Sequence, residues 1–429
     1  MNKKAKIISV DMGYGHQRTA YSLKELAFND EIIDANSYDG IPDKDKKIWE
    51  SFNEFYEFVS RFKRIPLIGS FIFSLFDKYQ EIASFYPKRD LSNPNLSTKK
   101  AYDFFEDGWG SHLIRYLGKK RIPLICTFYI PAFMAEYFNY PGDIYCVVCD
   151  ADISRAWVPL HPSTSKIKYF APTKRVVERL KLYGVRPNNI FFTGYPLPIK
   201  NIGEENLSVL KQDLAKRLLV LDPQKKYLER YKSLVQDNLK KIPEKRPHPL
   251  TLMFAVGGAG AQKEIGGQIL KSLKEKIKEN EIRLILVAGI RKEVKKYFFD
   301  QVKDLDLEEY LGEGIKIIFK EEIHDYFSEF NSTLRETDIV WTKPSEISFY
   351  SGLGLPLILA PCIGSQERFN KRWLLNSGFA IEQYNPNHTD EWLFDYLDKG
   401  WLAEAAMEGF IETEKRGFLS IKKIISKKY

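Results

Sequence analysis

One histidine stands where a strand is expected to give way to a helix, in the stretch DMGYGH that ends at His16. The β-branched residues 6–10 predict the strand, and a helix is expected from this stretch to about Ala27. Gly13 and Gly15 let the backbone approach a ligand closely and turn amides toward an anion. An imidazole with an ordinary pKa can accept a proton from a hydroxyl at neutral pH, so His16 is our candidate general base. A histidine that only binds backbone or phosphate is an equally open interpretation.

A glycine-rich loop follows a second predicted strand, residues 250–256. Its residues could bring backbone amides to a ligand: Gly257, Gly258, Ala259, Gly260 and Ala261. A helix is expected over residues 263–280, and loop amides at a helix amino terminus stabilise a diphosphate. A dinucleotide fingerprint competes, but neither its glycine register nor its acidic ribose contact is clear. A tight turn without a ligand is the structural alternative.

Polar residues follow two more apolar runs near the carboxyl end of the chain. Residues 339–341 and 355–360 predict strands, with a turn and a short helix over residues 346–351 between them. A further helix is expected to start near Gln366. The carboxyl ends of parallel strands share one edge of a sheet, where ligands collect in open α/β folds. We therefore expect one site there, with these candidate residues: Lys343, Ser345, Glu346, Gln366, Glu367 and Asn370.

Apolar runs and helical stretches alternate along most of the chain. Strands are expected near residues 123–128, 145–149, 190–193, 284–288 and 315–319. This alternation predicts an α/β fold with parallel sheets. A length of 429 residues suits two domains better than one.

Composition narrows the class of protein. The chain has a formal net charge of +8, with lysines interleaved with glutamates as on solvated helix faces. The remaining positive charge favours phosphates or an anionic membrane, and no nucleic-acid-binding module is found. The chain has no run of about 18 apolar residues, so no spanning helix is expected, and its start does not read as a signal peptide. We expect a cytoplasmic protein, at most peripheral to a membrane surface.

The spacing of cysteine and histidine residues predicts neither disulfides nor metal. The four cysteines are scattered, and the six histidines lack the paired spacing of metal ligands. Cys146 and Cys149 have redox spacing but lie in a β-like run, so core packing is preferred. Asp150 and Asp152 end the same run, and are interpreted as residues of a cleft or as an acidic strand end.

An aromatic stripe at helical spacing covers residues 49–62, and an apolar stretch follows over residues 65–76. The stripe contains Trp49, Phe52, Phe55, Tyr56, Val59 and Phe62. Packing against the first sheet is the preferred interpretation. Contact with a membrane is the alternative.

Together these landmarks resemble the GT-B glycosyltransferases, which have two domains. The branch they resemble contains the diacylglycerol galactosyltransferases and the peptidoglycan lipid-intermediate N-acetylglucosaminyltransferase. The first loop resembles the family's Gly-Gly-Gly-His loop, with Tyr14 in place of the middle glycine. The other matching segments are Gly194-Tyr-Pro196, Gly257–Ala261, Lys343-Pro-Ser345, Gly354-Leu-Pro356 and Gln366-Glu-Arg-Phe-Asn370.

The resemblance implies two Rossmann-like domains facing a cleft. It places an acceptor domain at residues 1–199, a junction with a charged helical insertion at 200–249 and a donor domain at 250–405. Residues 406–429 would form a last helix that returns to the first domain.

The implied activity is inverting transfer of a sugar from a nucleotide diphosphate sugar, with UDP as the expected nucleotide, to an acceptor hydroxyl. The acceptor would be a lipid or a glycoconjugate such as a lipid-linked sugar. Residues 257–261 would bind the diphosphate, Lys343 and Ser345 the nucleotide, and Gln366, Glu367 and Asn370 the sugar hydroxyls. Amides and helix dipoles would stabilise the departing diphosphate, so neither a metal nor a separate cofactor is expected.

The chain departs from the family at one position. Relatives carry a ribose-binding glutamate before Gly-Leu-Pro, where this chain has Phe349; Glu346 lies earlier in the same helix. Glu346 could bind the ribose from a shifted position, or the donor could differ. Two other functions stay open, a nucleotide-sugar 2-epimerase of the same architecture and a non-catalytic binding protein.

Overall fold

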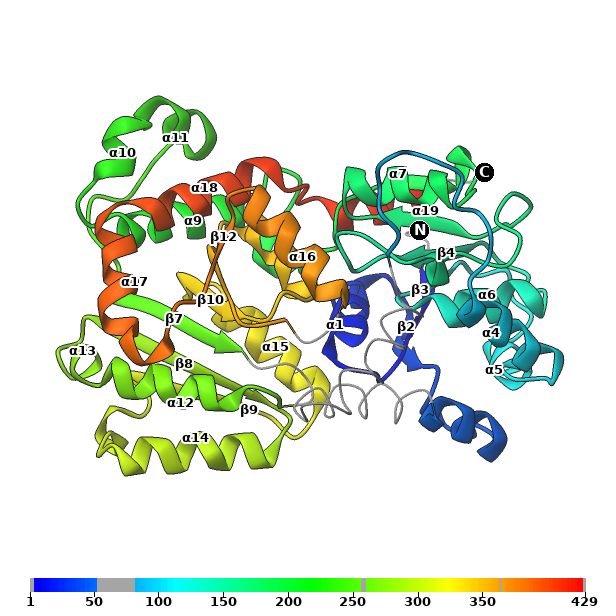
Figure 1. Cartoon of the computed structure of the whole chain (residues 1–429), viewed down its shortest axis with the longest axis horizontal. Coiled ribbons are helices and arrows are strands. Elements are labelled where there is room, and N and C mark those ends of the chain that lie inside the picture. The colour runs from blue at the N-terminus through cyan, green and yellow to red at the C-terminus, as the bar shows by residue number, and fades with distance from the viewer. Residues whose placement is uncertain (1–3, 52–81, 256–259, 363–364, 427–429) are drawn as a thin grey trace. The chain divides into compact units, whose positions relative to one another are not determined.

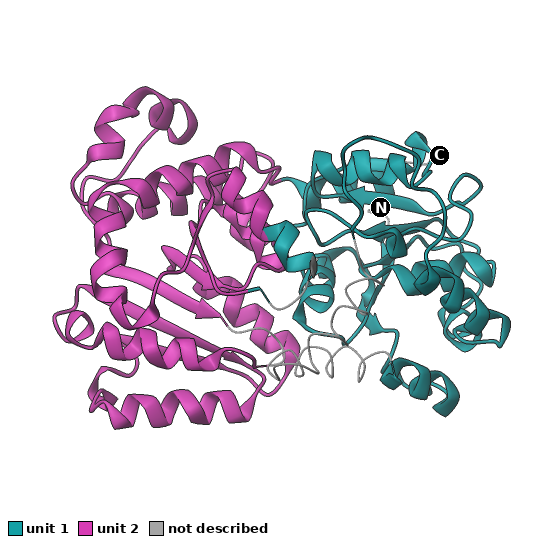
Figure 2. Ribbon diagram, viewed as in Figure 1, with its two compact units in different colours: residues 1–196, 362–370, 416–429 teal, residues 197–361, 371–415 magenta. Residues whose placement is uncertain are grey.

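A computed structural model describes residues 4–51, 82–255, 260–362 and 365–426 (Figure 1). The chain divides into two compact units (Figure 2). Unit 1 contains residues 1–196, 362–370 and 416–429, and unit 2 contains residues 197–361 and 371–415. Each unit is built on a six-stranded parallel sheet covered by helices. This confirms the expected α/β class with two Rossmann-like domains of the GT-B type.

The sheet of unit 1 has the strand order β2-β1-β3-β4-β5-β6. Its strands are β1 (Ala5–Ser9), β2 (Ala27–Asp34), β3 (Leu124–Cys126), β4 (Ile144–Val147), β5 (Lys168–Ala171) and β6 (Ile190–Phe192). The central strands β3 and β4 are fully buried, as expected where helices cover both faces of a parallel sheet. Because β1, β3 and β4 are neighbours, the loops that follow them start at one edge of the sheet.

The helices of unit 1 connect these strands. They are α1 (Tyr14–Ser22), η1 (Lys24–Leu26), α4 (Leu96–Glu106), α5 (Ser111–Leu117), α6 (Tyr129–Tyr137), η2 (Arg155–Trp157), α7 (Lys174–Leu182), η3 (Pro187–Asn189) and α19 (Gly417–Ser426). The helix expected to reach Ala27 ends at Ser22, and the strand β2 was not predicted. A Cβ atom on Gly417 would lie 2.2 Å from the backbone oxygen of Tyr195, so only glycine lets α19 pack this closely.

The aromatic stripe can be followed only at its start. Trp49 is buried and its ring meets that of Trp109 edge-on, with ring centroids 4.9 Å apart. This is core packing, as preferred for the stripe. The other residues of the stripe and the apolar stretch at residues 65–76 lie outside the described residues.

The sheet of unit 2 has the strand order β12-β11-β10-β7-β8-β9. Its strands are β7 (Leu250–Ala255), β8 (Ile282–Gly289), β9 (Ile315–Phe319), β10 (Ile339–Thr342), β11 (Leu357–Leu359) and β12 (Ala380–Glu382). Since β10 lies between β7 and β11, three of the loops predicted to bind a ligand leave neighbouring strands at one edge.

Helices cover both faces of this sheet (Figure 1). They are α8 (Ile199–Ile202), α9 (Ser208–Leu221), α10 (Lys226–Arg230), α11 (Lys232–Leu239), α12 (Lys263–Ser272), α13 (Lys274–Lys278), α14 (Lys292–Asp304), η4 (Glu308–Tyr310), α15 (Ile323–Thr333), η5 (Glu346–Leu353), α16 (Ser365–Asn376), η6 (Pro386–His388), α17 (Thr389–Asp398) and α18 (Trp401–Glu412). The single helix expected over residues 263–280 is wrong. The backbone leaves the helical region at Leu273 (φ −89°, ψ 4°), which separates α12 from α13.

A close approach fixes the helix that follows the glycine-rich loop. A Cβ atom on Gly266 would lie 2.7 Å from the ring of Phe298 and 2.9 Å from that of Phe254. Glycine at this position therefore lets α12 pack against both β7 and α14. The amino end of α12 is held where β7 ends.

A buried arginine organises the opposite edge of the sheet, where β10 and β11 begin. The Arg217 guanidinium donates hydrogen bonds to the backbone oxygens of Thr337 (2.9 Å), Leu353 (2.7 Å), Gly354 (3.1 Å) and Leu334 (3.3 Å). These oxygens belong to the carboxyl end of η5 and to the chain just before β10. Arg217 therefore fixes both ends of the segment that carries Lys343, Ser345 and Glu346.

Candidate functional site

His16 is held at the start of α1 by the neighbouring strand β3. Its Nδ1 lies 2.7 Å from the backbone oxygen of Thr127. Because a carbonyl oxygen only accepts hydrogen bonds, Nδ1 must carry a proton. In the neutral ring Nε2 is then the basic nitrogen. The structure therefore gives His16 the tautomer that a general base needs.

Thr127 also holds the backbone of His16. Its hydroxyl donates to the backbone oxygen of His16 at 3.0 Å, and its own amide donates to the oxygen of Ile8 at 2.9 Å. One residue at the end of β3 thus fixes both the ring and the main chain of the candidate base. No feature of the sequence indicates this role beyond the position of Thr127 at a strand end.

Apolar and sulfur-containing side chains surround the imidazole. The ring centroid of His16 lies 4.8 Å from that of Phe128 and 6.2 Å from that of Trp157. The Cys149 sulfur lies 3.4 Å from Nδ1. Trp157 and Cys149 are buried, whereas His16 and Phe128 are partly exposed.

The cysteines agree with the expected core packing. Cys146 and Cys149 are both buried, and neither forms a disulfide within the described residues. Burial raises the pKa of the Cys146 thiol well above its usual value, which opposes redox chemistry there. The sequence did not predict that Cys149 would lie beside His16.

The acidic end of β4 has two different partners. Asp152 is buried and pairs with both Arg179 (2.8 Å) and Arg175 (3.2 Å). This is a structural ion pair, which supports interpreting Asp152 as a strand end. Asp150 instead accepts a hydrogen bond from the side-chain amide of Asn370 at 3.0 Å.

Residues 365–370 of α16 cluster with unit 1, and Asn370 ties them to the chain after β4. Its side-chain oxygen accepts from the amide of Ala151 at 2.7 Å, while its nitrogen donates to Asp150. Asn370 therefore holds the first turns of α16 in place. Glu367 is buried and Gln366 half-buried in the same turns.

The amino end of α12 and the loop after β11 meet at the edge of the second sheet. Gly257, Gly258 and Ala259 lie outside the described residues, whereas Gly260, Ala261 and Gln262 lead into α12. The Gln262 side chain donates a hydrogen bond of 2.8 Å to the backbone oxygen of Pro361. Gln262 was not among the predicted residues. This bond joins the ends of two loops that come from strands on either side of β10.

The turn after β10 brings three of the predicted residues to the same edge. Lys343 and Ser345 are half-buried, and Glu346 is 6% exposed at the first position of η5. Phe349 packs on Trp373, with ring centroids 5.3 Å apart, and is 1% exposed. Phe349 therefore belongs to the core, and Glu346 is the acidic residue of this helix.

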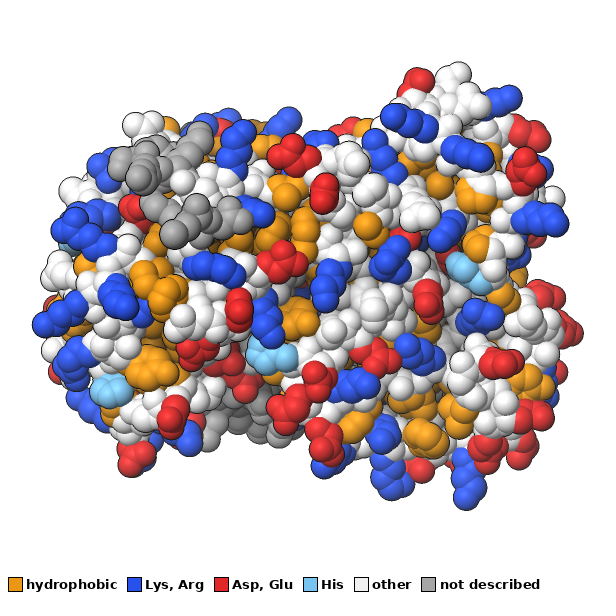
Figure 3. Space-filling model, turned by 180° about the vertical axis from the view of Figure 1, so that it is seen from behind, with side chains coloured by type: hydrophobic (Ala, Val, Ile, Leu, Met, Phe, Trp, Pro, Cys, Tyr) orange, Lys and Arg blue, Asp and Glu red, His pale blue; other side chains and the backbone are white. Residues whose placement is uncertain are grey.

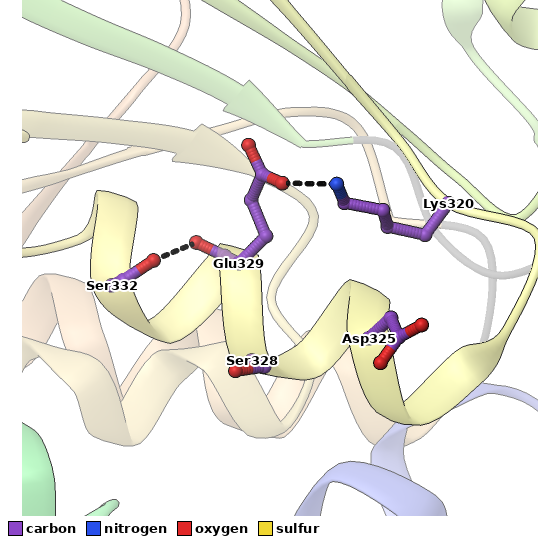
Figure 4. Close-up of a pocket in the computed structure, with 5 residues that line it drawn as sticks. All are labelled: Lys320, Asp325, Ser328, Glu329 and Ser332. Atoms are coloured by element: carbon purple, nitrogen blue, oxygen red, sulfur yellow. Dashed lines mark hydrogen bonds and ion pairs between the residues drawn. The ribbon is translucent and has the colours of Figure 1, made fainter.

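A polar hollow of about 320 Å³ lies along α15, lined by Lys320, Asp325, Ser328, Glu329 and Ser332 (Figure 4). The Lys320 ammonium reaches across to Glu329 at 2.8 Å. Lys316 pairs with the same carboxylate at 3.0 Å. Lys320 and Glu329 are thus paired within the protein, and none of the residues that line the hollow is among the predicted site residues.

Neither a metal-binding cluster nor a spanning helix is found in the part of the chain that the structure describes. No group of three or more His, Cys, Asp or Glu residues could hold an ion there. Among the same residues, no helix combines the length and apolar character needed to cross a bilayer.

Comparison with known proteins confirms the resemblance seen in the motifs. The chain is 24% identical over 393 residues to the processive diacylglycerol beta-glucosyltransferase of Bacillus subtilis (strain 168), covering 89% of this chain and 83% of that protein. The same enzyme of Bacillus licheniformis aligns with 24% identity over 392 residues and the same coverage. Both relatives are glycosyltransferases, which confirms the predicted class of enzyme.

The remaining similarities cover a short part of the chain or have low structural similarity scores. A family described as a domain of unknown function (DUF6938) matches residues 229–312. The structure of Acinetobacter baumannii MurG is 12% identical and covers 99% of both chains with a TM-score of 0.48. S. aureus MnaA with UDP is 13% identical and covers 99% of this chain and 95% of its own, with a TM-score of 0.47. With TM-scores below 0.5, the fold assignment rests on the two sheets themselves.

Proposed function

We propose that this protein transfers a sugar from a nucleotide diphosphate sugar, with UDP as the nucleotide, to a hydroxyl of a lipid acceptor. One observation carries the proposal. The hydrogen bond between Gln262 and Pro361 joins the amino end of α12, which follows β7, to the loop after β11, from strands on either side of β10. That edge then offers a helix amino terminus, a lysine and a buried carboxylate to a single ligand.

Each part of a nucleotide diphosphate finds a suitable group at this edge. The glycine-rich loop and the first amides of α12 would bind the diphosphate, because helix amino termini favour anions. Glu346, at the start of η5, would accept hydrogen bonds from the ribose hydroxyls. Lys343 and Ser345 would line the nucleotide, and Gln366 and Glu367 the sugar.

His16 would serve as the base. As the acceptor hydroxyl attacks the anomeric carbon, its proton passes to Nε2 of His16 and the bond from that carbon to the diphosphate oxygen breaks. The electron pair of that bond leaves with the diphosphate, whose added charge the loop amides would stabilise. A single displacement of this kind inverts the anomeric configuration. The proton on Nδ1, directed at Thr127, supports this assignment.

A lipid acceptor is supported by the curated relatives, which are named for transfer to diacylglycerol. The half-exposed ring of Phe128 beside His16 offers an apolar surface to such an acceptor. The same relatives favour transfer over epimerisation.

The test uses UDP-glucose and diacylglycerol dispersed in detergent. Glycolipid should form with the wild-type protein and fall at least a hundredfold with His16→Ala. A free epimer of the donor sugar without any acceptor would identify an epimerase instead. Tight UDP binding with neither product would identify a binding protein.

A further inference from the structure

The junction helices carry a concentrated positive charge. Residues 224–246 contain eight basic side chains and three acidic ones, a net charge of +5 in a chain whose total is +8. The basic residues are Lys225, Lys226, Arg230, Lys232, Lys240, Lys241, Lys245 and Arg246, and all eight are exposed. We call these eight residues the basic cluster.

The cluster stands on a small projecting element. Helices α10 and α11 stand out from the rest of unit 2 (Figure 1). The buried residues of this element include Tyr227, Val235 and Leu239, and the cations are exposed. Seen from behind, the projecting lobe carries several basic side chains (Figure 3). The fold thus anchors this element by an apolar side and presents its charge to solvent.

Two cations of the cluster have contacts within the described residues that are not ion pairs: Arg246 donates a 3.2 Å hydrogen bond to the backbone oxygen of His248, and the Arg230 guanidinium lies 5.4 Å from the centroid of the Tyr231 ring. Among the same described residues, no carboxylate lies within 4.0 Å of any cation of the cluster. Some lysines on other helices of unit 2 are paired, such as Lys276 with Glu281 and Lys296 with Asp300, both at 2.7 Å. Exposed cations at this density that have no carboxylate partner repel one another. Binding to an external anionic surface would relieve that repulsion.

We propose that the basic cluster docks the protein on an anionic membrane surface, an inference that rests on the proposed lipid acceptor. A lysine or arginine near such a surface strengthens binding roughly fivefold. Leu234 of α11 is 36% exposed among the cations and supplies an apolar contact.

Single-stranded nucleic acid is a less suitable partner for the basic cluster, because its bases need exposed aromatic rings for stacking. Tyr227 is buried, and the ring of Tyr231 is covered by Tyr227 and Arg230.

The test compares three double variants that each remove two positive charges. Lys226→Gln with Arg230→Gln, and Lys240→Gln with Lys241→Gln, neutralise the cluster. Lys271→Gln with Lys303→Gln neutralises two exposed lysines of α12 and α14 and is the matched control. Binding is measured by co-sedimentation with vesicles of phosphatidylglycerol and phosphatidylcholine, and with phosphatidylcholine alone.

The wild-type protein should bind only the anionic vesicles, and added salt should weaken binding. Each cluster variant should lower the partition coefficient roughly twentyfold, and the control less than threefold. All three should keep wild-type turnover of detergent-dispersed diacylglycerol. If the wild-type protein binds anionic vesicles but does not turn over diacylglycerol, the result would contradict the proposed function and leave the docking inference intact.

Three results would overturn the inference. The control could weaken vesicle binding as much as the cluster variants, which would show an effect of total charge. The cluster variants could bind vesicles like the wild type. Single-stranded DNA at the same salt concentration could outcompete the vesicles for the wild-type protein and lose its binding in the cluster variants.

Discussion

The Nδ1 atom of His16 lies 2.7 Å from the backbone oxygen of Thr127, and the Thr127 hydroxyl returns a 3.0 Å hydrogen bond to the backbone of His16. This reciprocal pair fixes which nitrogen of the ring carries the proton. It also joins the loop after β1 to the end of β3, so the candidate base is positioned by the sheet itself.

Replacing His16 by alanine tests the base directly. Loss of proton transfer should lower kcat by about 10²–10⁴-fold. Binding of UDP, measured by calorimetry, should stay unchanged because the nucleotide is assigned to unit 2. Thr127→Val keeps the backbone acceptor and removes only the hydroxyl, so its kcat should fall by less than about tenfold. Equal losses in both variants would contradict the assigned roles.

Replacing Gln262 by asparagine tests the link between the two donor loops. Gln262 has φ 67°, which asparagine tolerates, but the shorter side chain does not reach Pro361. One hydrogen bond contributes about 0.5–1.5 kcal/mol, so the Kd of UDP should rise about two- to tenfold. Gln268→Asn, further along the same helix, is the control and should bind UDP like the wild type. Unchanged UDP affinity in Gln262→Asn would show that this hydrogen bond does not contribute to the donor site.

Arg217→Lys should destabilise unit 2. A lysine ammonium cannot reach all four carbonyl oxygens that the guanidinium binds. Each buried carbonyl left without a donor costs about 1–3 kcal/mol, so we expect a loss of about 3 kcal/mol or more in urea unfolding. Arg335→Lys is the control, since its pair with Asp213 at 2.8 Å is half-exposed and should cost about 1 kcal/mol or less. Similar midpoints for the two variants would show that Arg217 does not organise the start of β10 and β11.

Asp338 should make stability depend on pH. Burial raises its pKa from 3.8 to about 6, against the smaller opposing effects of His248 and Arg217. The folded protein therefore holds a proton more tightly than the unfolded chain, and the stability from this group is lost as pH rises from about 4 through 6. Asp338→Asn can still accept the hydrogen bond from the Thr251 amide. Its urea midpoint should fall less between pH 4.5 and 7 than the wild type's, and parallel pH profiles would refute the assignment.

The second sheet could be predicted well because its signals are local. Apolar runs followed by glycine or Lys-Pro-Ser turns located β7, β10 and β11, and parallel pairing then placed their loops at one edge. The segment expected as a helix over residues 346–351 is found as η5, Glu346–Leu353. The structure also shows why Phe349 can stand where relatives have the ribose-binding glutamate: its side chain is part of the core.

Other features depend on contacts between distant parts of the chain, which no local pattern reveals. The contact of Asn370 with Asp150 spans 220 residues, and that of His16 with Thr127 spans 111. The edge strand β2 was missed because only its first residue, Ala27, is buried and its sequence, AFNDEIID, is largely polar. The break at Leu273 has no proline or glycine to mark it.

Calorimetric titration of UDP tests the donor site most directly, with the wild-type protein and Glu346→Gln compared. The substitution keeps the size of the side chain and removes the charge that would accept from both ribose hydroxyls. Hydrogen bonds to charged groups contribute about 1.5–3 kcal/mol, so UDP should bind the wild type and lose about ten- to a hundredfold in affinity with Glu346→Gln. No binding of UDP to the wild type, or equal binding to both proteins, would contradict the donor site proposed at this edge.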